Sequence, residues 1–273
     1  MAERHGSDLS TIKTTDMALA LKRISVLKRF ADPRSVSGLA AWYDATQGVY
    51  NATSGGSLVT TNGSAIARWE DMSGNARHLT QTNTVYRPTL QTGGRNGRNV
   101  VAFNSDGMAT AFPGLGLNKV YVFYVAKWNA WASNTYDNLF GVTGANAGQL
   151  QVFNYLGTLH HRFHTNGFWE PSISSFNNTN YYYAFASFPR AINASYTYQL
   201  YIDKVLRSQN TASDNGGNYS AARTFYVGNN GDPTNYGNLN ATIAEIVFYV
   251  RPNNLSSKDM QNLNNYFSLK WGF

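Results

Sequence analysis

Residues 241–272 of this chain read ATIAEIVFYVRPNNLSSKDMQNLNNYFSLKWG, which is a strand, a break and a helix in succession. Within this stretch Ile243–Val250 is apolar at both alternating sets of positions, and Glu245 is its only charged residue. A strand that is apolar on both sides is covered on both faces. Pro252 breaks the strand because proline has no N–H to donate to a sheet ladder. The sequence therefore predicts a doubly covered strand that stops at this proline.

A helix start signal follows the break. Ser256 and Asp259 have the spacing of a capping box, with Asp in place of the usual Glu or Gln. Met260, Leu263 and Phe267 then recur on one face of a short helix. The end of the chain is therefore predicted to form an amphipathic helix that runs to the final Trp-Gly.

The composition is typical of a β-rich protein. The 273 residues include 24 Gly, 18 Tyr, 15 Phe and 6 Trp, which suits short aromatic strands joined by tight turns. Strands are expected at 37–45, 99–103, 120–127, 139–142, 150–155, 158–165, 181–187, 196–202, 205–209, 224–228 and 243–250. Strands at this density, with no fixed internal repeat, predict a two-sheet antiparallel sandwich.

Charge and cysteine content narrow the function classes. Only 14% of the residues are charged, and the net charge is +7. Such a weakly charged surface is common on proteins that work in a larger assembly or outside a cell. The chain has no cysteine, which excludes disulfides, cysteine-ligated zinc and thiol chemistry. No apolar run approaches the roughly 20 residues of a membrane span, and we expect no secretory signal.

Residues 1–34 differ from the rest of the chain. They carry seven Lys or Arg and four Asp or Glu, a net charge of +3, and no Trp or Tyr. Within them Asp16–Phe30 is predicted to form a basic amphipathic helix that cannot bury its apolar stripe alone. The residues assigned to this partner-binding arm are Met17, Leu21, Lys22, Arg23, Ile24, Leu27, Lys28, Arg29 and Phe30. We divide the chain into this basic helical arm, residues 1–35, and a sandwich domain, residues 36–273.

Three kinds of partner compete for the arm. The helix can dock on its own sandwich, on a membrane surface or nucleic acid, or on other subunits. Only four basic residues lie within the helix, which disfavours a membrane and nucleic acid. We favour docking onto other subunits, so that residues 1–34 anchor the protein, and we expect a homo-oligomer.

Several motifs carry a family resemblance. They are Trp42-Tyr43-Asp44-Ala45, the loop Trp69–Asn75, Arg87-Pro88, the hairpin Tyr198–Leu206, Tyr226–Asn229 and the closing stretch 241–272. With these motifs, the chain resembles the laminin-G-like, concanavalin A-like jelly-roll domains. The resemblance implies an all-β, two-sheet antiparallel jelly-roll sandwich, here with an N-terminal helical arm and a short C-terminal helix. Lys204 departs from the pattern, because relatives have Gly after the Asp, so we expect a loop longer than a two-residue type I′ turn.

Domains of this kind serve lectins, glycosidases, adhesion modules and viral surface proteins. Their glycosidases carry a Glu-x-Asp-x-x-Glu pattern, which is absent here. The glutamates of the chain are Glu3, Glu70, Glu170 and Glu245, and Glu70-Asp71 is the sole adjacent acidic pair. No nucleophile motif or phosphate loop is found. The sequence therefore disfavours an enzyme.

No metal site is assigned from the sequence. His160, His161 and His164 form the only histidine cluster, but Arg162 lies among them and alternate strand positions face opposite sides. Laminin-G-like domains often carry calcium, so the resemblance leaves calcium open. The candidate ligands, which have no dedicated spacing, are Asp106, Asp137, Asp214 and Asp232. We expect no other cofactor.

Two segments are candidates for sugar binding. Trp128-Asn129-Ala130-Trp131 and Asn166-Gly167-Phe168-Trp169 each place Trp beside Asn in a turn-like setting. Exposed aromatic rings stack on the apolar faces of sugars, and nearby amides bind the hydroxyls. The candidate residues are therefore Trp128, Trp131 and Trp169. The alternative is that these tryptophans close the ends of the sandwich or lie at a subunit interface.

Together these observations favour a non-enzymatic structural protein of a bacteriophage particle, such as a head-decoration, fibre or tail component. In this interpretation residues 1–34 bind other virion proteins, and the jelly roll is displayed outward on a virion assembled in the host cytoplasm. The alternative is a carbohydrate-binding receptor-recognition module whose partner is a host-surface glycan. A polysaccharide-cleaving enzyme is the weakest alternative.

Overall fold

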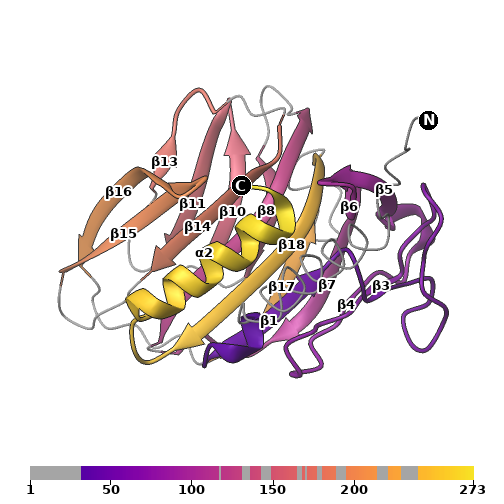
Figure 1. Cartoon of the computed structure of the whole chain (residues 1–273), viewed down its shortest axis with the longest axis horizontal. Coiled ribbons are helices and arrows are strands. Elements are labelled where there is room, and N and C mark those ends of the chain that lie inside the picture. Colours follow the sequence, from indigo (N-terminus) through magenta and orange to yellow (C-terminus); the bar gives the residue numbers. More distant parts are fainter. Residues whose placement is uncertain are drawn as a thin grey trace, which may run out of the picture.

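The computed structural model describes residues 32–116, 118–130, 136–142, 149–164, 168–169, 171–176, 180–188, 195–213, 221–228 and 239–273. The predicted arm helix, from Asp16 to Phe30, lies outside these residues, as does Trp131. The described part is mostly β, with two antiparallel sheets and one C-terminal helix (Figure 1). The predicted all-β sandwich is confirmed.

The first sheet contains eight of the described strands in the order β16-β15-β14-β8-β18-β6-β5, with β1 also beside β18. Their bounds are β1 (Leu39–Asp44), β5 (Thr89–Arg95), β6 (Arg98–Asn104), β8 (Lys119–Ala130), β14 (Tyr182–Phe188), β15 (Ser195–Ile202), β16 (Val205–Ser213) and β18 (Asn240–Arg251). The long strands β8 and β18 pair with each other and form the centre of this sheet.

The second sheet contains ten of the described strands in the order β12-β11-β10-β9-β17-β7-β4-β3-β2, with β13 also beside β11. Their bounds are β2 (Val49–Tyr50), β3 (Arg68–Trp69), β4 (Leu79–Thr80), β7 (Gly107–Phe112), β9 (Asp137–Val142), β10 (Gln149–Tyr155), β11 (Thr158–His164), β12 (Phe168–Trp169), β13 (Ser172–Ile173) and β17 (Arg223–Gly228). The described helices are η1 (Pro33–Ser35), η2 (Thr84–Tyr86) and α2 (Ser257–Trp271).

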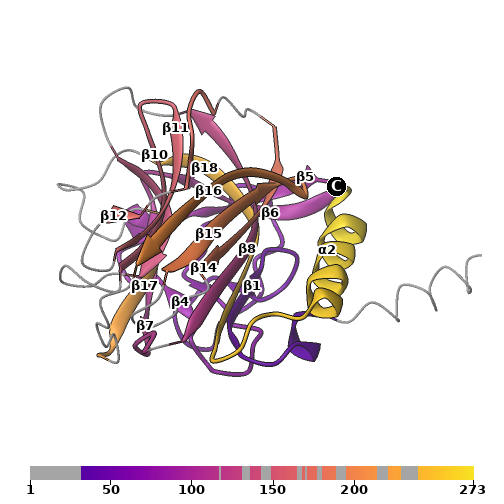
Figure 2. The ribbon, with the colours of Figure 1, turned by 90° about the vertical axis from the view of Figure 1, so that its left-hand side faces the viewer.

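Two separate cores explain the doubly apolar strand β18. Ile246 and Phe248 belong to the core between the two sheets. Val247 and Tyr249 belong to a second core, which includes Phe267 of α2. Figure 2 shows α2 lying along the outer side of the first sheet. The prediction that both faces of this strand are covered is therefore confirmed, and the cover on the outer face is the C-terminal helix.

Helix α2 begins and ends as its sequence predicts. The Ser256 side chain accepts a hydrogen bond from Asp259 N at 3.1 Å, and the Asp259 carboxylate accepts one from Ser256 N at 3.2 Å. This reciprocal pair is a capping box. The helix ends at Gly272, whose φ of 77° places it in the left-handed region that glycine adopts without strain. No helix in the described ranges is long and apolar enough to cross a membrane.

The β15–β16 hairpin differs from its prediction. Only Asp203 and Lys204 connect the two strands, with φ values of 48° and 68°, so the connection is a two-residue turn rather than a longer loop. Asp203 is held by Tyr183, whose N–H donates to Oδ1 at 2.9 Å and whose carbonyl accepts from Asp203 N at 2.8 Å. Lys204 Nζ donates to Ser268 Oγ and to the Phe273 carbonyl, at 3.0 and 2.9 Å. These contacts offset the cost of positive φ at residues other than glycine.

Candidate functional site

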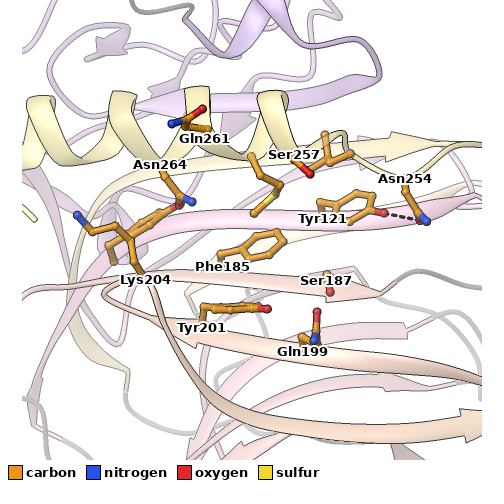
Figure 3. Close-up of a pocket in the computed structure, with 13 residues that line it drawn as sticks. Tyr121, Phe185, Ser187, Gln199, Tyr201, Lys204, Asn254, Ser257, Gln261 and Asn264 are labelled. Carbon is orange, nitrogen blue, oxygen red and sulfur yellow. Dashed lines mark hydrogen bonds between the residues drawn. The ribbon is translucent and has the colours of Figure 1, made fainter.

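A groove of about 630 Å³ lies between α2 and the outer face of strands β8, β14 and β15 (Figure 3). Its lining residues are Tyr121, Tyr183, Phe185, Ser187, Gln199, Tyr201, Lys204, Asn254, Leu255, Ser257, Met260, Gln261 and Asn264. The sheet contributes aromatic side chains and the helix side contributes amides and a hydroxyl. An apolar floor with a polar rim is the usual composition of a small-ligand site.

The floor of the groove is a row of aromatic rings on three neighbouring strands. Phe185 and Tyr201 are directly opposite each other on β14 and β15, with ring centroids 5.5 Å apart. Tyr121 on β8 stacks on Phe185 at 6.3 Å, with the two ring planes 5° apart. Cross-strand aromatic pairs stabilise a sheet, so these contacts also help to hold the three strands together. Tyr201 is the half-buried member of the row and faces the open side of the groove.

The rim carries amides whose orientation is fixed by buried tyrosines. The Tyr121 hydroxyl donates to Asn254 Oδ1 at 3.0 Å, and the Tyr183 hydroxyl donates to Asn264 Oδ1 at 2.8 Å. Burial raises the pKa of both hydroxyls, so both remain protonated donors at neutral pH. The amide NH₂ groups of Asn254 and Asn264 have no acceptor among the described residues. They are therefore available to a ligand.

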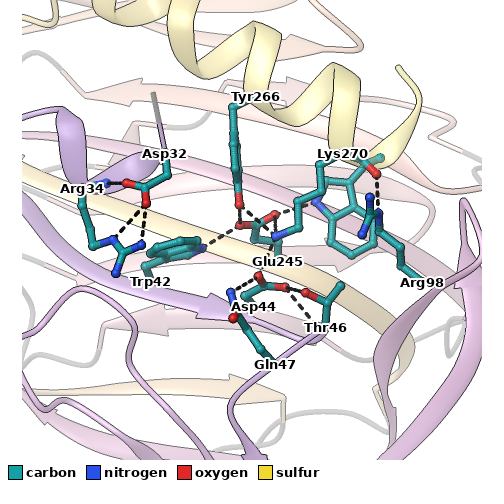
Figure 4. A network of polar contacts seen from close by, with 11 residues as sticks. Asp32, Arg34, Trp42, Asp44, Thr46, Gln47, Arg98, Glu245, Tyr266 and Lys270 are labelled. Atoms are coloured by element: carbon teal, nitrogen blue, oxygen red, sulfur yellow. Dashed lines mark hydrogen bonds and ion pairs between the residues drawn. The ribbon is translucent and has the colours of Figure 1, made fainter. Parts of the chain in front are cut away.

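A charged cluster holds α2 against the sheet at the other end of the helix (Figure 4). Glu245 is fully buried, and its Oε1 accepts from Trp42 Nε1 and from the Tyr266 hydroxyl, each at 2.6 Å. Its Oε2 accepts from Trp271 Nε1 at 2.5 Å and lies 3.0 Å from Lys270 Nζ. Burial raises the pKa of Glu245, and the Lys270 ammonium acts in the opposite direction. Both oxygens of this carboxylate therefore have hydrogen-bond or ion-pair partners inside the protein.

The structure brings Glu245 an acidic neighbour that the sequence does not reveal. Asp44 lies directly opposite Glu245 in the pairing of β1 with β18, and its Oδ2 is 2.7 Å from Lys270 Nζ. Thr46 and Gln47 donate the remaining hydrogen bonds to Asp44. A pocket of about 460 Å³ borders this cluster on the side of α2 away from the groove. Both carboxylates are buried and fully hydrogen-bonded, which is the geometry of a structural ion cluster.

The structure places the three predicted tryptophans differently. Trp128 lies within β8, is only 1% exposed, and donates from Nε1 to the Tyr182 hydroxyl at 3.0 Å. The expectation that Trp128 stacks on a sugar is therefore wrong, because β18 pairs with β8 as far as Ala130 and keeps the segment in the sheet. Trp169 ends β12, paired with Phe163 in β11. Trp131 lies outside the described residues, so both remaining tryptophans stay predictions.

The histidines and aspartates do not converge within the described structure. His161 is buried in the core, where its Nε2 lies 2.8 Å from the Tyr124 hydroxyl, whereas His160 stacks on Phe153 with ring centroids 4.7 Å apart. Among the described residues no group of three His, Asp or Glu side chains could hold a metal ion. Asp106 hydrogen-bonds Asn104 N at 2.9 Å. Of the other calcium candidates, Asp137 is buried at the start of β9, and Asp214 and Asp232 lie outside the described residues.

The groove was not predicted from the sequence, because it is formed by residues of three strands, a loop and a helix. The available signal was the set of outward aromatic positions, Tyr121, Phe185 and Tyr201, once the strand register is known. The consecutive tyrosines Tyr181, Tyr182 and Tyr183 are a partial hint, because successive strand positions face opposite sides. Tyr182 does face the inter-sheet core, and Tyr183 faces α2.

Comparison with known proteins gives a likeness of fold. No family model and no curated protein sequence matches the chain. The Trypanosoma rangeli sialidase in complex with sialic acid is 12% identical, with a TM-score of 0.56, over 96% of this chain and 40% of that chain. The binding domain of botulinum neurotoxin DC in complex with SialylT is 11% identical, with a TM-score of 0.51, over 86% and 52%. The binding domain of Paraclostridial Mosquitocidal Protein 1 is 14% identical, with a TM-score of 0.54, over 76% and 51%.

These likenesses concern only part of each solved chain. The protein spans about half of the length of the toxin binding domains and less of the sialidase. At such low identity a structural match establishes architecture and not activity. The two antiparallel sheets fit a jelly-roll-like sandwich, and the chain shares a β-sandwich fold with parts of these proteins.

Proposed function

We propose that the chain is a carbohydrate-binding receptor-recognition module whose sugar site is the groove between α2 and strands β8, β14 and β15. The observation that carries the proposal is the combination in one groove of the half-buried Tyr201 ring with amides on the rim. A sugar ring can stack on the aromatic side chain while the amides bind its hydroxyls. The structural likeness to a sialidase with sialic acid and to a toxin binding domain with SialylT supports the same class of ligand.

We further propose that the module binds without catalysis. The carboxylates that the fold brings together, Asp44 and Glu245, are buried and hydrogen-bonded on all sides, and neither lines the groove. A glycosidase needs a carboxylate pair with access to the scissile bond. The described residues that line the groove include hydroxyls and amides but no acidic side chain. These features support a binding role.

A role in a bacteriophage virion is compatible with this proposal but has less support. Such a role places the anchoring function in residues 1–34, which lie outside the described residues. The matched proteins are toxin binding domains and a sialidase. Their binding domains favour a receptor-recognition module over a purely structural subunit. Host glycan is therefore the partner that we propose for the sandwich, and virion proteins remain a prediction for the arm.

Screening the full chain on a glycan array tests the proposed function. We expect a restricted set of glycans to bind, and we expect Tyr201→Ala and Gln261→Ala to abolish that binding. Gln261 is exposed on α2, so its replacement leaves the core intact. The matched control is Val85→Ala, an exposed position away from the groove lining, which should bind as wild type does.

Two outcomes would overturn the proposal. Absence of any bound glycan for the wild-type chain would remove the carbohydrate-binding function. Binding that survives Tyr201→Ala and Gln261→Ala but is lost in Trp131→Ala or Trp169→Ala would move the sugar site from the groove to the predicted tryptophans. Circular dichroism spectra of every variant should match the wild-type spectrum, which confirms that each protein is folded.

A further inference from the structure

The groove is unusual in the charge of the side chains that line it. Among the thirteen described residues that line it, Lys204 is the only charged side chain and there is no carboxylate. Carboxylates are the side chains that only accept hydrogen bonds, and they form strong ones with hydroxyl donors. Without them, the only charged group that lines the groove is a pure donor, the Lys204 ammonium, beside amides and hydroxyls that can also donate. The groove therefore matches a ligand that is rich in acceptors.

The orientation of the rim amides strengthens this bias. Tyr121 and Tyr183 each donate to an asparagine oxygen, on Asn254 and Asn264 respectively. Each of these oxygens therefore accepts a bond from a tyrosine on the sheet, and both NH₂ groups are left to donate. Reversing either amide would place its NH₂ against the tyrosine hydroxyl and lose the donation that the geometry shows. The two asparagines thus act as fixed donors on opposite ends of the groove (Figure 3).

The positive charge lies at one end only. Lys204 Nζ donates to Ser268 Oγ at 3.0 Å, and Ser268 Oγ donates to the Asn264 carbonyl at 2.7 Å. These bonds place the ammonium one helical turn from Asn264, and Figure 3 shows both residues at the end of the groove opposite Asn254. An ammonium group has three N–H donors, and contacts to Ser268 and Phe273 use two of them. The third is available to a ligand.

The backbone conformation at Lys204 is also one that costs free energy for a residue with a side chain. Its φ of 68° lies in the left-handed region, which an L-residue other than Asn, Asp or Gly adopts at a cost of about 1 kcal/mol. The lysine at this turn is exposed and holds its ammonium beside the end of α2.

We infer that the groove selects glycans that carry an anionic substituent, a carboxylate or a sulfate, and that this substituent binds between Lys204 and Asn264. The neutral rings of the glycan then extend over Tyr201 toward Asn254. Hydrogen bonds from charged donors to an anionic acceptor are roughly twice as strong as neutral ones, so this end dominates selectivity. The inference rests on the proposed function and adds the class of ligand and its direction in the groove.

Asparagine-to-aspartate exchanges at the two ends give a matched test. Asn264→Asp keeps an oxygen for the Tyr183 hydroxyl but replaces the NH₂ donor by a second oxygen with a negative charge. Asn254→Asp makes the same chemical change at the opposite end. Lys204→Gln removes the ammonium and retains a polar side chain. All three are made in the full chain, and urea unfolding confirms that each remains folded.

Titration calorimetry with lactose, 3′-sialyllactose and 3′-sulfolactose measures the selectivity. The wild-type chain should bind at least one of the two anionic lactoses more tightly than lactose, by about tenfold or more, because one charge-assisted bond is worth about that ratio. Asn264→Asp and Lys204→Gln should each remove most of this preference and leave lactose affinity within about twofold. Asn254→Asp should retain the preference. Binding of only the sialylated probe would identify the anion as a carboxylate, and binding of both would identify charge as the determinant.

Three results would overturn the inference. They are equal affinity for lactose and its anionic derivatives, equal losses in Asn264→Asp and Asn254→Asp, and no binding of any of the three probes. The glycan array separates this failure from failure of the proposed function. If neutral glycans bind on the array and this binding is lost in Tyr201→Ala, the groove binds carbohydrate but does not select anions.

Discussion

Asp44 and Glu245 lie directly opposite each other on β1 and β18, and a single ammonium group, Lys270 Nζ, contacts both carboxylates at 2.7 and 3.0 Å. Lys270 belongs to α2, so this contact ties the last helix to the centre of the first sheet. The same helix forms one wall of the groove. The stability of the charged cluster therefore determines how firmly that wall is held.

Lys270→Met should destabilise the protein strongly. The substitution leaves two buried carboxylates facing each other without a cation, and breaking a buried ion pair by removing one partner costs about 3–5 kcal/mol. Urea unfolding measures the free energy of unfolding. Lys258→Met, an exposed position in the first turn of the same helix, is the matched control and should change it by less than about 0.5 kcal/mol. Equal, small effects of the two substitutions would show that Lys270 does not hold the charged cluster together.

The β15–β16 turn gives a second pair of matched variants. Asp203→Ala should cost about 2 kcal/mol, because alanine adopts positive φ poorly and cannot accept the hydrogen bond from Tyr183 N. Asp203→Asn should be close to neutral, since its amide oxygen accepts the same bond and asparagine tolerates this backbone region. Thermal and urea unfolding of the two variants measure the difference. A loss of similar size in both would show that the carboxylate charge, and not the turn geometry, matters at this position.

Local patterns in the sequence were sufficient to predict the parts of the fold that depend on neighbouring residues. The apolar run Ile243–Val250 predicts a doubly covered strand, and Ser256 with Asp259 predicts the start of α2. Both follow from side-chain periodicity and backbone hydrogen bonding within a few residues. The all-β sandwich follows from the repetition of such strands. These elements are therefore readable before any tertiary contact is known.

The site depends instead on register between distant strands, which no local pattern encodes. Trp128 illustrates the difference, because Asn129 beside it is typical of a turn, yet pairing with β18 extends β8 through Ala130. Asp44 meets Glu245 for the same reason, through the pairing of the first and last strands of the sandwich. Tertiary contacts override local propensity at such positions. The groove, with walls from α2 and three strands, is predictable only once the register is known.

Stability measurements can distinguish a core role of Trp128 from a role as a surface on which sugars stack. Trp128→Ala should lower the free energy of unfolding by about 3–5 kcal/mol, because it empties a large volume in the core and leaves the Tyr182 hydroxyl without its indole donor. Trp128→Phe fills most of that volume and should cost less. Unfolding in guanidinium measures both variants. An unchanged stability for Trp128→Ala, together with loss of glycan binding, would restore the surface role that the sequence suggested.

The pH dependence of stability should report on His161. Burial lowers the pKa of this imidazole to about 3, well below its ordinary value of 6.5. Between these two values the unfolded chain binds a proton at this position and the native protein does not. The free energy of unfolding therefore falls as the pH falls through this range, by about 1.4 kcal/mol per pH unit from this residue.

Comparison with His161→Gln isolates that contribution from other titrating groups. Glutamine can keep a hydrogen bond to the Tyr124 hydroxyl but does not titrate. Glu245 acts in the opposite sense, since its raised pKa gives stability that is present at low pH and lost as the pH rises, but it is common to both proteins. Urea unfolding at pH 7, 6 and 5 should therefore show the stability of the wild-type chain falling by about 2 kcal/mol more than that of the variant between pH 7 and 5. Parallel pH profiles for the two proteins would mean that His161 titrates near its ordinary value and is not sealed in the core.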